Sequence, residues 1–451
     1  MNASLRPGFV RFLHRGCLLL AALALVVPAV VSAQIAAKVV RSRVAGIDLV
    51  AYRTSVEQIV TLRGSLPAGD AFCPPDNPAI ATLVAGMLDK GTTRQGKFAI
   101  AEQLERVGAS ITFNAGNHDL TFSVRCLRED LPLVLGLLAE ELRTPAFAAD
   151  EFAKYQRQLI GSLRRQLENT GARADVAFSQ AIYPVGHSNR QAGFEELIAG
   201  VEAAKVEDLR AFHAAHFGPA QMALVAVGDL PAELQAEVER GFAGWTGGNP
   251  PPLSGPAAGA AGDVAREQTV VVPGKTSVDV AWGMATGLKY RDPDALALRV
   301  GTAVFGSGFT GRLMSNVRDK DGLTYGIYSY VTNDSVTDGD WRITATFAPA
   351  LLAKGIESTR RQLTLWHDQG ITAAELAQRQ RELVGNFQVN LATTSGLAQA
   401  LLTTVQRGLE LTWLDEYPAR INALTLEQVN RAIRTHLDPA KMVLIQAGTL
   451  P

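Results

Sequence analysis

The hydrophobic positions of the chain repeat with two periods, one typical of helices and one typical of strands. Residues 77–91 show the helical period, since Asn77 and Pro78 open the stretch and Gly91 closes it. In both halves, short strand-like runs stand beside long helical stretches. This order predicts an α+β fold in which each domain has a mainly antiparallel sheet with helices packed on one face. The expected strands are 111–113, 120–124, 269–281 and 323–331, and the expected helices are 130–142, 150–167 and 292–304.

Two segments of the first half recur in the second half. Residues 216–230 align with residues 436–450, and seven of the fifteen positions are identical. Residues 147–163 align with residues 371–387, and seven of the seventeen positions are identical. The two offsets, 220 and 224 residues, are nearly equal, which indicates a duplicated domain. We therefore expect two domains of the same fold with a groove between them.

A segment rich in Gly, Pro and Ala separates the two repeats. It covers residues 247–262, and its composition is typical of a linker. The linker divides the chain into an N-terminal domain of residues 34–246 and a C-terminal domain of residues 263–451.

The first 33 residues have the layout of a secretory signal peptide. Three arginines precede an apolar run over residues 17–31, and small residues up to Ala33 suit a signal peptidase. The apolar run is shorter than the ~20 residues that a transmembrane helix needs. We expect residues 1–33 to be removed from an exported, periplasmic protein, and retention of this segment as an anchor is the alternative.

Composition narrows the classes of function. With 47% hydrophobic and 19% charged residues, the chain can form a large core, and its net charge of −1 gives no basic face for nucleic acid. Beyond the signal segment, Cys73 and Cys126 are the two remaining cysteines. They can be bridged or free in an oxidising compartment. We expect them to approach each other near the start of the helix after Pro78.

Residues 77–91 resemble a helix of the pitrilysin/insulinase-type zinc metallopeptidases. Residues 87–92 match the Met-Leu-x-x-Gly-Thr that follows the His-x-x-Glu-His motif of that family. Carried over, the two histidines fall on Thr82 and Gly86, and the glutamate falls on Ala85. These residues offer neither a zinc ligand set nor a base. The resemblance therefore implies a peptidase-like domain with a vacated zinc helix.

The remaining positions of the zinc site are also vacant. The third ligand of the family, a glutamate on a later helix, would fall near Gly161 or Ser162. His213 and His216 are three residues apart on an expected helix, but His216 recurs as His436 in the repeat. A structural role for both histidines is therefore the better interpretation, and we expect no metal in this chain.

The second half resembles the other part of the family's site, where a small-residue loop precedes an Arg and a Tyr seven residues apart. The loop holds Gly306, Gly308 and Gly311, and the pair is Arg318 and Tyr325. The resemblance implies that the loop contacts substrate and that the pair acts on it opposite a zinc helix. An arginine can hold a peptide carbonyl, and a tyrosine hydroxyl can donate to a developing oxyanion.

Two other interpretations apply to this region. Tyr325 alternates with Leu323 and Ile327, which by itself would suit a core tyrosine. The three glycines formally match a dinucleotide fingerprint, but the βαβ context and the acidic residue about 20 positions later are missing. We therefore expect no nucleotide.

In several branches of this family, the activity is split between a zinc-bearing subunit and a subunit with the Arg/Tyr pair. The resemblance thus implies a non-catalytic, substrate-binding subunit of a heterodimeric zinc endopeptidase. Its expected partners are a zinc-bearing homologous peptidase subunit and a peptide or unfolded protein, with the zinc in the partner. The alternative is a peptide-binding or scaffold protein with the same fold and no hydrolytic partner. For an autonomous hydrolase, the sequence shows no nucleophile–base pair.

Overall fold

The computed structural model describes residues 34–253, 255–257 and 266–450. The expected signal peptide and part of the expected linker, residues 254 and 258–262, lie outside the described residues. The described residues of the linker form neither helix nor strand.

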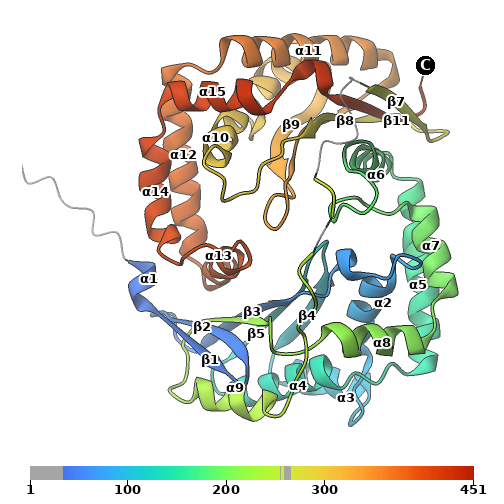
Figure 1. The fold of residues 1–451 in the computed structure, drawn as a ribbon, viewed down its shortest axis with the longest axis vertical. Coiled ribbons are helices and arrows are strands. Elements are labelled where there is room, and N and C mark those ends of the chain that lie inside the picture. Colours follow the sequence, from blue (N-terminus) through green and yellow to red (C-terminus); the bar gives the residue numbers. More distant parts are fainter. Residues whose placement is uncertain (1–33, 254, 258–265, 451) are drawn as a thin grey trace, which may run out of the picture.

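The described chain contains two sheets, one in each half (Figure 1). The first has the order β1-β2-β6-β3-β5-β4 and the second the order β7-β11-β8-β10-β9. Apart from β1, the two orders correspond strand for strand. Both sheets have one parallel pair, β2–β6 and β7–β11, among antiparallel pairs. The strands are β1 (Val39–Val44), β2 (Ile47–Arg53), β3 (Ile59–Leu66), β4 (Ser110–Ala115), β5 (Leu120–Leu127), β6 (Ala223–Gly228), β7 (Arg266–Val271), β8 (Val278–Ala285), β9 (Thr324–Thr332), β10 (Asp340–Phe347) and β11 (Val443–Gly448).

The helices repeat in the same order, so the predicted α+β fold with two homologous domains is confirmed. Helix α2 lies between β3 and β4, and its counterpart α10 lies between β8 and β9. The repeated segments occupy equivalent positions, in α5 and α12 and in the α8–β6 and α15–β11 units. The helices are α1 (Ile35–Lys38), α2 (Ile80–Met87), α3 (Lys97–Arg106), α4 (Leu131–Arg143), α5 (Ala149–Leu167), α6 (Thr170–Ile182), α7 (Phe194–Ala203), α8 (Val206–His216), α9 (Leu234–Phe242), α10 (Ala295–Gly306), α11 (Leu352–Gln369), α12 (Ala373–Leu391), α13 (Thr394–Gln406), α14 (Trp413–Ala423) and α15 (Leu426–His436).

Strands β6 and β11 are buried along their whole length. The apolar run of β6 is continuous, as is typical of a strand covered on both faces, whereas β11 contains one polar residue, Gln446, which hydrogen-bonds to Glu267. In β6, Leu224 and Ala226 face the helices of the first half, whereas Val225 and Val227 belong to a separate core. That second core includes Leu401 of α13, from the other half. One face of the sheet is thus covered by its own helices and the other by a helix from the opposite half.

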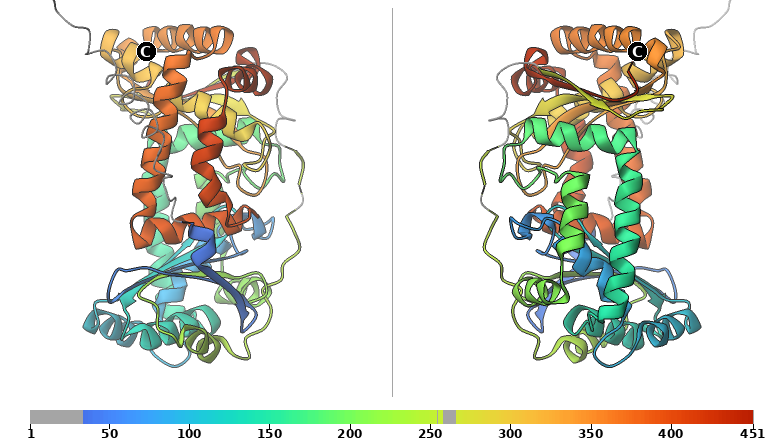
Figure 2. Two further views of the ribbon diagram at one scale, coloured as in Figure 1. Left: turned by 90° about the vertical axis from the view of Figure 1, so that its left-hand side faces the viewer. Right: turned by 90° about the vertical axis from the view of Figure 1, so that its right-hand side faces the viewer.

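The exchange of helices is reciprocal. Helix α13 packs on β3 and β6 of the first sheet, and α6 packs on β8 and β11 of the second (Figure 1). Phe178 of α6 lies in one core with Ala281 and Ile445. The long helices α5 and α12 run between the halves, accompanied by α7 and α14 (Figure 2). Each half therefore completes the core of the other.

Two details of the sequence interpretation are wrong. The expected strand 269–281 is two strands, β7 and β8, because Pro273 and Gly274 form a turn in which Gly274 has a φ of 72°. Asn77 does not cap α2 directly, since its side chain accepts a hydrogen bond from the backbone of Ala79, one residue before the helix begins.

The expected approach of Cys73 and Cys126 is also wrong, and both are free thiols. Leu66 at the end of β3 pairs with Leu120, whereas Cys126 pairs with Val60 near the start of β3. The backbone nitrogen of Ala71 donates to the carbonyl oxygen of Asn117, which places the segment just before Cys73 at the turn between β4 and β5. Cys126 lies six residues along β5 from that end, which is about 20 Å of strand. A disulfide needs Cα atoms within about 7 Å.

Candidate functional site

Helix α2 occupies the place of the expected zinc helix. Its residues Ile80, Leu83, Val84 and Met87 are buried in the core of the first half. The helix ends in a 3-10 turn, and Gly91 follows with a φ of 111°, a conformation that favours glycine. The apolar residues of α2 thus face the core, and the face with Thr82 and Gly86 turns away from it.

The space next to Gly86 is occupied by Tyr155 of α5. A Cβ atom at position 86 would lie 2.0 Å from both Cζ and Oη of Tyr155. Burial, with a smaller effect from Asp89, raises the pKa of the Tyr155 hydroxyl. A larger side chain at position 86 therefore cannot coexist with Tyr155 in its present position.

The other vacated positions do not fit zinc either. The hydroxyl of Thr82 is a hydrogen-bond partner of the Asp70 carboxylate, and Ala85 is buried and apolar. Gly161 and Ser162 lie on α5 and offer no carboxylate or imidazole. Within the part of the chain that the structure describes, no three His, Cys, Asp or Glu side chains are placed to hold a metal ion.

His213 and His216 lie in the last turn of α8, where both pack against aromatic rings. His213 Nε2 lies 2.8 Å from the carbonyl oxygen of Leu142, and its ring stacks on Phe217. The ring of His216 lies 4.4 Å from that of Phe212. These contacts support the structural interpretation of both histidines.

Arg318 and Tyr325 are not part of the core. Arg318 lies on the π-helical segment η3 (Met314–Lys320), and Tyr325 lies near the start of the edge strand β9. The Tyr325 residue is 97% exposed. The Arg318 side chain is 38% exposed and donates a hydrogen bond to Asp319 at 2.9 Å. Such an exposed ion pair contributes about 0–1 kcal/mol, so the guanidinium can exchange it for another acceptor.

Tyr325 departs from strand alternation because of a β-bulge. Thr324 pairs with Phe347 and Ile327 pairs with Ala345, so Tyr325 and Gly326 stand opposite the single residue Thr346. A bulge of this kind re-aims side chains along an edge strand. The core interpretation of Tyr325 is therefore wrong, whereas contact of Tyr325 with substrate stays a prediction.

The three glycines allow the loop after α10 to pack closely. A Cβ at Gly306 would lie 2.4 Å from the backbone nitrogen of Ser329 on β9, and one at Gly311 would lie 3.1 Å from Cα of Gly306. Gly308 has a φ of 66° and open space around it. Backbone geometry thus explains all three residues, and their contact with substrate stays a prediction.

Two side chains of α12 fix this loop. Arg312 donates two hydrogen bonds to the carboxylate of Glu375, at 2.6 and 2.7 Å. Burial opposes ionisation of Glu375, but hydrogen bonds from Arg312 and from Thr372 outweigh it and lower its pKa to about 2. Arg379 donates to the hydroxyl of Thr310. The sequence interpretation missed Tyr155 and Glu375, since no spacing in the sequence relates them to Gly86 and Arg312.

A cavity lies beside the vacated helix. It has a volume of about 730 Å³ and is lined by Asp70 and Cys73 before α2, by Asp175 of α6 and by the segment around His187 and Arg190. Burial raises the pKa of the Cys73 thiol to about 12, so this thiol stays protonated at neutral pH.

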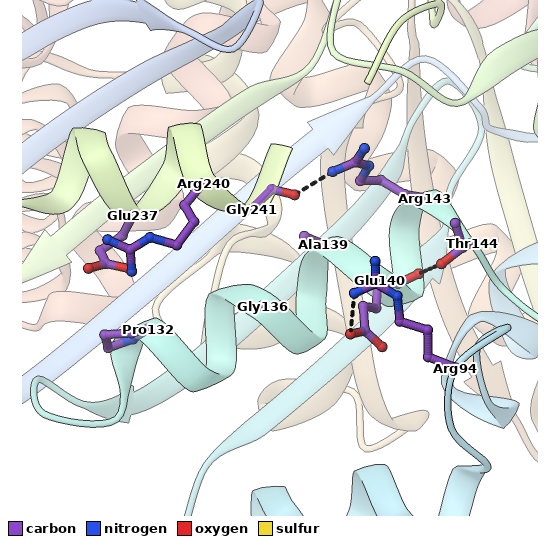
Figure 3. A pocket seen from close by; sticks show the side chains of 10 residues that line it. All are labelled: Arg94, Pro132, Gly136, Ala139, Glu140, Arg143, Thr144, Glu237, Arg240 and Gly241. Carbon is purple, nitrogen blue, oxygen red and sulfur yellow. Dashed lines mark hydrogen bonds and ion pairs between the residues drawn. The ribbon is translucent and has the colours of Figure 1, made fainter. Parts of the chain in front are cut away.

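A smaller pocket of about 250 Å³ lies between α4 and α9 (Figure 3). Its charged groups pair with one another or with backbone, since Arg94 pairs with Glu140 and Arg240 with Glu237. Arg143 donates to the carbonyl oxygens of Gly241 and Ala243. These contacts hold the ends of the two helices together.

Comparisons with known proteins agree on one family. Residues 49–180 match the model described as insulinase (peptidase family M16), and residues 203–383 match the model described as the peptidase M16 inactive domain. The crystal structure of a peptidase M16 inactive domain from Pseudomonas fluorescens superposes with a TM-score of 0.84 at 25% identity, over 92% of this chain and 98% of that chain. The periplasmic protease PqqL from Escherichia coli shares the fold, with a TM-score of 0.72 at 16% identity, over 91% of this chain and 46% of that one.

Relatives found by sequence are named either as zinc proteases or as a non-peptidase homolog. An uncharacterized zinc protease of Streptomyces coelicolor is 22% identical over 77% of this chain and 76% of its own length. The non-peptidase homolog YmxG of Helicobacter pylori is also 22% identical, over 80% of this chain and 82% of its own length. No helix in the described part of the chain is both long and apolar enough to cross a bilayer.

Proposed function

The chain belongs to the insulinase family of peptidases (peptidase M16). We propose that it is a non-catalytic subunit, which binds substrate and completes the active site of a zinc-bearing partner. The support is a contrast between two places in the fold. At α2, the zinc positions lack ligands and Tyr155 fills the space at Gly86. On the second half, Arg318 and Tyr325 are exposed, so both can reach another molecule.

The chemistry assigned to this chain is binding and electrostatic stabilisation. The guanidinium of Arg318 holds a carbonyl oxygen of an extended peptide. The hydroxyl of Tyr325 donates to the oxyanion that develops when the scissile carbonyl is attacked. The chemistry that this chain lacks, activation of a water, would come from a zinc ion held by the partner subunit.

Reconstitution tests the proposal. The purified mature chain alone should contain no stoichiometric zinc and should cleave no peptide. Purified from its native source, it should bring with it a homologous subunit that has a His-x-x-Glu-His motif, and the mixture should cleave unfolded polypeptide. A chain that purifies without any such subunit, or a zinc-bearing subunit that cleaves equally well without this chain, would contradict the proposal.

A peptide-binding or scaffold role without a hydrolytic partner is the second candidate. The match to a relative called a non-peptidase homolog favours it. In that case, the native protein should bind unfolded polypeptide and copurify without a zinc-bearing homologue.

We also propose that the protein is exported to the periplasm. The layout of residues 1–33 and the fold shared with a periplasmic protease support this location. Cell fractionation and N-terminal sequencing test it, and the mature chain should begin at Gln34.

A further inference from the structure

Four of the large exposed side chains lie between residues 309 and 330 of the sequence, one on the glycine loop and three on β9. Phe309 is 70% exposed, and Tyr325, Tyr328 and Tyr330 are also exposed. Scattered single apolar residues are ordinary on a surface, whereas a group of aromatic ones is typical of a binding surface. The other large hydrophobic residues exposed in the described chain are Val40, Val56, Phe98, Val185, Val271, Leu365 and Val389.

The chain around Phe309 is anchored although the Phe309 side chain is exposed. Phe309 follows Gly308 at the tip of the glycine loop, and two side-chain contacts just after it anchor the loop to α12. These are Thr310 with Arg379 and Arg312 with Glu375. Because the backbone is already anchored, a ligand that covers Phe309 has to order only its two side-chain torsions, which keeps the entropy cost of binding low.

Phe309 also lies beside the proposed peptide-binding arginine. The guanidinium carbon of Arg318 is 5.6 Å from the centre of the Phe309 ring. A peptide whose carbonyl is held by Arg318 therefore places a neighbouring side chain within reach of the ring. The guanidinium takes up part of the ring surface, and most of the remainder faces water.

We infer that Phe309 is a specificity-determining contact, which selects peptides with a large apolar side chain, preferably an aromatic one, next to the carbonyl held by Arg318. This inference rests on the proposed role of Arg318. Burial of an aromatic side chain against a second ring favours such peptides by roughly tenfold over peptides with a polar residue at the same position.

Fluorescence anisotropy with the purified mature chain tests the inference. The probes are labelled extended peptides that differ at one position, which is Phe, Leu, Ser or Asp. The wild-type chain should bind the Phe peptide roughly tenfold more tightly than the Ser peptide. Phe309→Ala should abolish this preference, and Phe309→Leu should retain a preference for Leu and Phe over Ser.

Phe98→Ala is the matched control. Phe98 is 79% exposed on α3 of the first half, with Lys97 Nζ 5.0 Å from its ring centre. Phe98→Ala therefore removes a similarly exposed aromatic ring and a similar cation contact. It should leave the peptide preference unchanged.

Two results would overturn the inference. One is a wild-type chain that binds no peptide, or binds all four equally. The other is a preference that survives Phe309→Ala or disappears with Phe98→Ala. Turnover of the reconstituted assembly is measured separately, so a proposed subunit role can hold while the role of Phe309 fails.

Discussion

The phenol ring of Tyr155 lies where a side chain on residue 86 would have to begin. Cζ and Oη of Tyr155 both come within 2.0 Å of the position of a Cβ on Gly86. Helices α2 and α5 pack on each other, and the absence of a side chain at Gly86 on α2 leaves room for the ring of Tyr155 on α5. Position 86 and Tyr155 therefore depend on each other, because a side chain at position 86 and the tyrosine ring would compete for the same space.

A double-mutant cycle tests this packing. In the wild-type background, Gly86→Ala should destabilise the fold by about 1–3 kcal/mol, since the tyrosine ring must move out of a packed position. In a Tyr155→Ala background, the same change should stabilise the fold by up to about 1 kcal/mol, because alanine favours a helix over glycine. Urea unfolding measures both values. The same sign in both backgrounds would show that the two residues do not compete for space.

Substitution of Tyr325 separates function from folding. Tyr325→Phe should leave thermal stability unchanged, because the side chain is in water. Turnover by the reconstituted assembly should fall by about 10²–10³, the typical effect of losing one oxyanion donor. Arg318→Ala should also weaken substrate binding. Unchanged turnover in a Tyr325→Phe assembly that cleaves its substrate would end the proposed mechanism for this residue.

Much of the fold can be predicted from the repeats and the periodicity, but the exchange of helices cannot. The apolar residues on both faces of β6, such as Leu224 and Val225, indicate that both faces are covered. They do not reveal that α13 of the other half covers one of them, because apolar contacts are not directional. Only the packed structure shows which helix meets which sheet.

Part of the candidate site can likewise be predicted from the sequence, and part of it cannot. The spacing of Arg318 and Tyr325 marks them as candidates, but alternation alone assigns Tyr325 to the core. A one-residue bulge shifts the phase of β9, and such a bulge cannot be read from the strand's own residues. Tyr155 was missed because its contact with Gly86 is purely tertiary.

Glu141 should make stability depend on pH. This glutamate of α4 is buried, and its Oε2 atom lacks a hydrogen-bond partner among the described residues. Burial, helped by the carboxylates of Asp89 and Glu140, raises its pKa to about 8 from the ordinary 4.5 of a glutamate. The folded chain therefore retains a proton that the unfolded chain loses between these values. Stability should fall as pH rises through this window, by up to about 1.4 kcal/mol per pH unit.

Glu141→Gln keeps the shape of the side chain and removes its ionisation. The variant should lose this slope and become more stable relative to wild type as pH rises towards 8. Glu102→Gln, on the exposed surface of α3, is the matched control and should follow the wild-type curve. Urea unfolding at several pH values measures the slopes, and equal slopes for wild type and Glu141→Gln would contradict the assignment.

The exchanged helices should make the two halves interdependent. A fragment of residues 34–246 lacks α13, so Val225 and Val227 of its sheet lose the helix that covers them. A fragment of residues 263–451 lacks α6, which leaves Ile445 uncovered in the same way. The apolar side chains on each uncovered sheet face would then meet water, which favours association over a stable monomer.

Each fragment alone should therefore bind a hydrophobic dye and unfold without a cooperative transition. Produced together, the fragments should copurify as a complex that unfolds cooperatively, since each supplies the missing helix of the other. Leu401→Ala in the intact chain removes one fully buried contact of α13 and should cost about 2–5 kcal/mol. Leu365→Ala, at an exposed position of α11, should cost much less. A fragment that remains monomeric and unfolds cooperatively would show that its sheet does not need the exchanged helix, and the two halves would then be independent domains that merely touch.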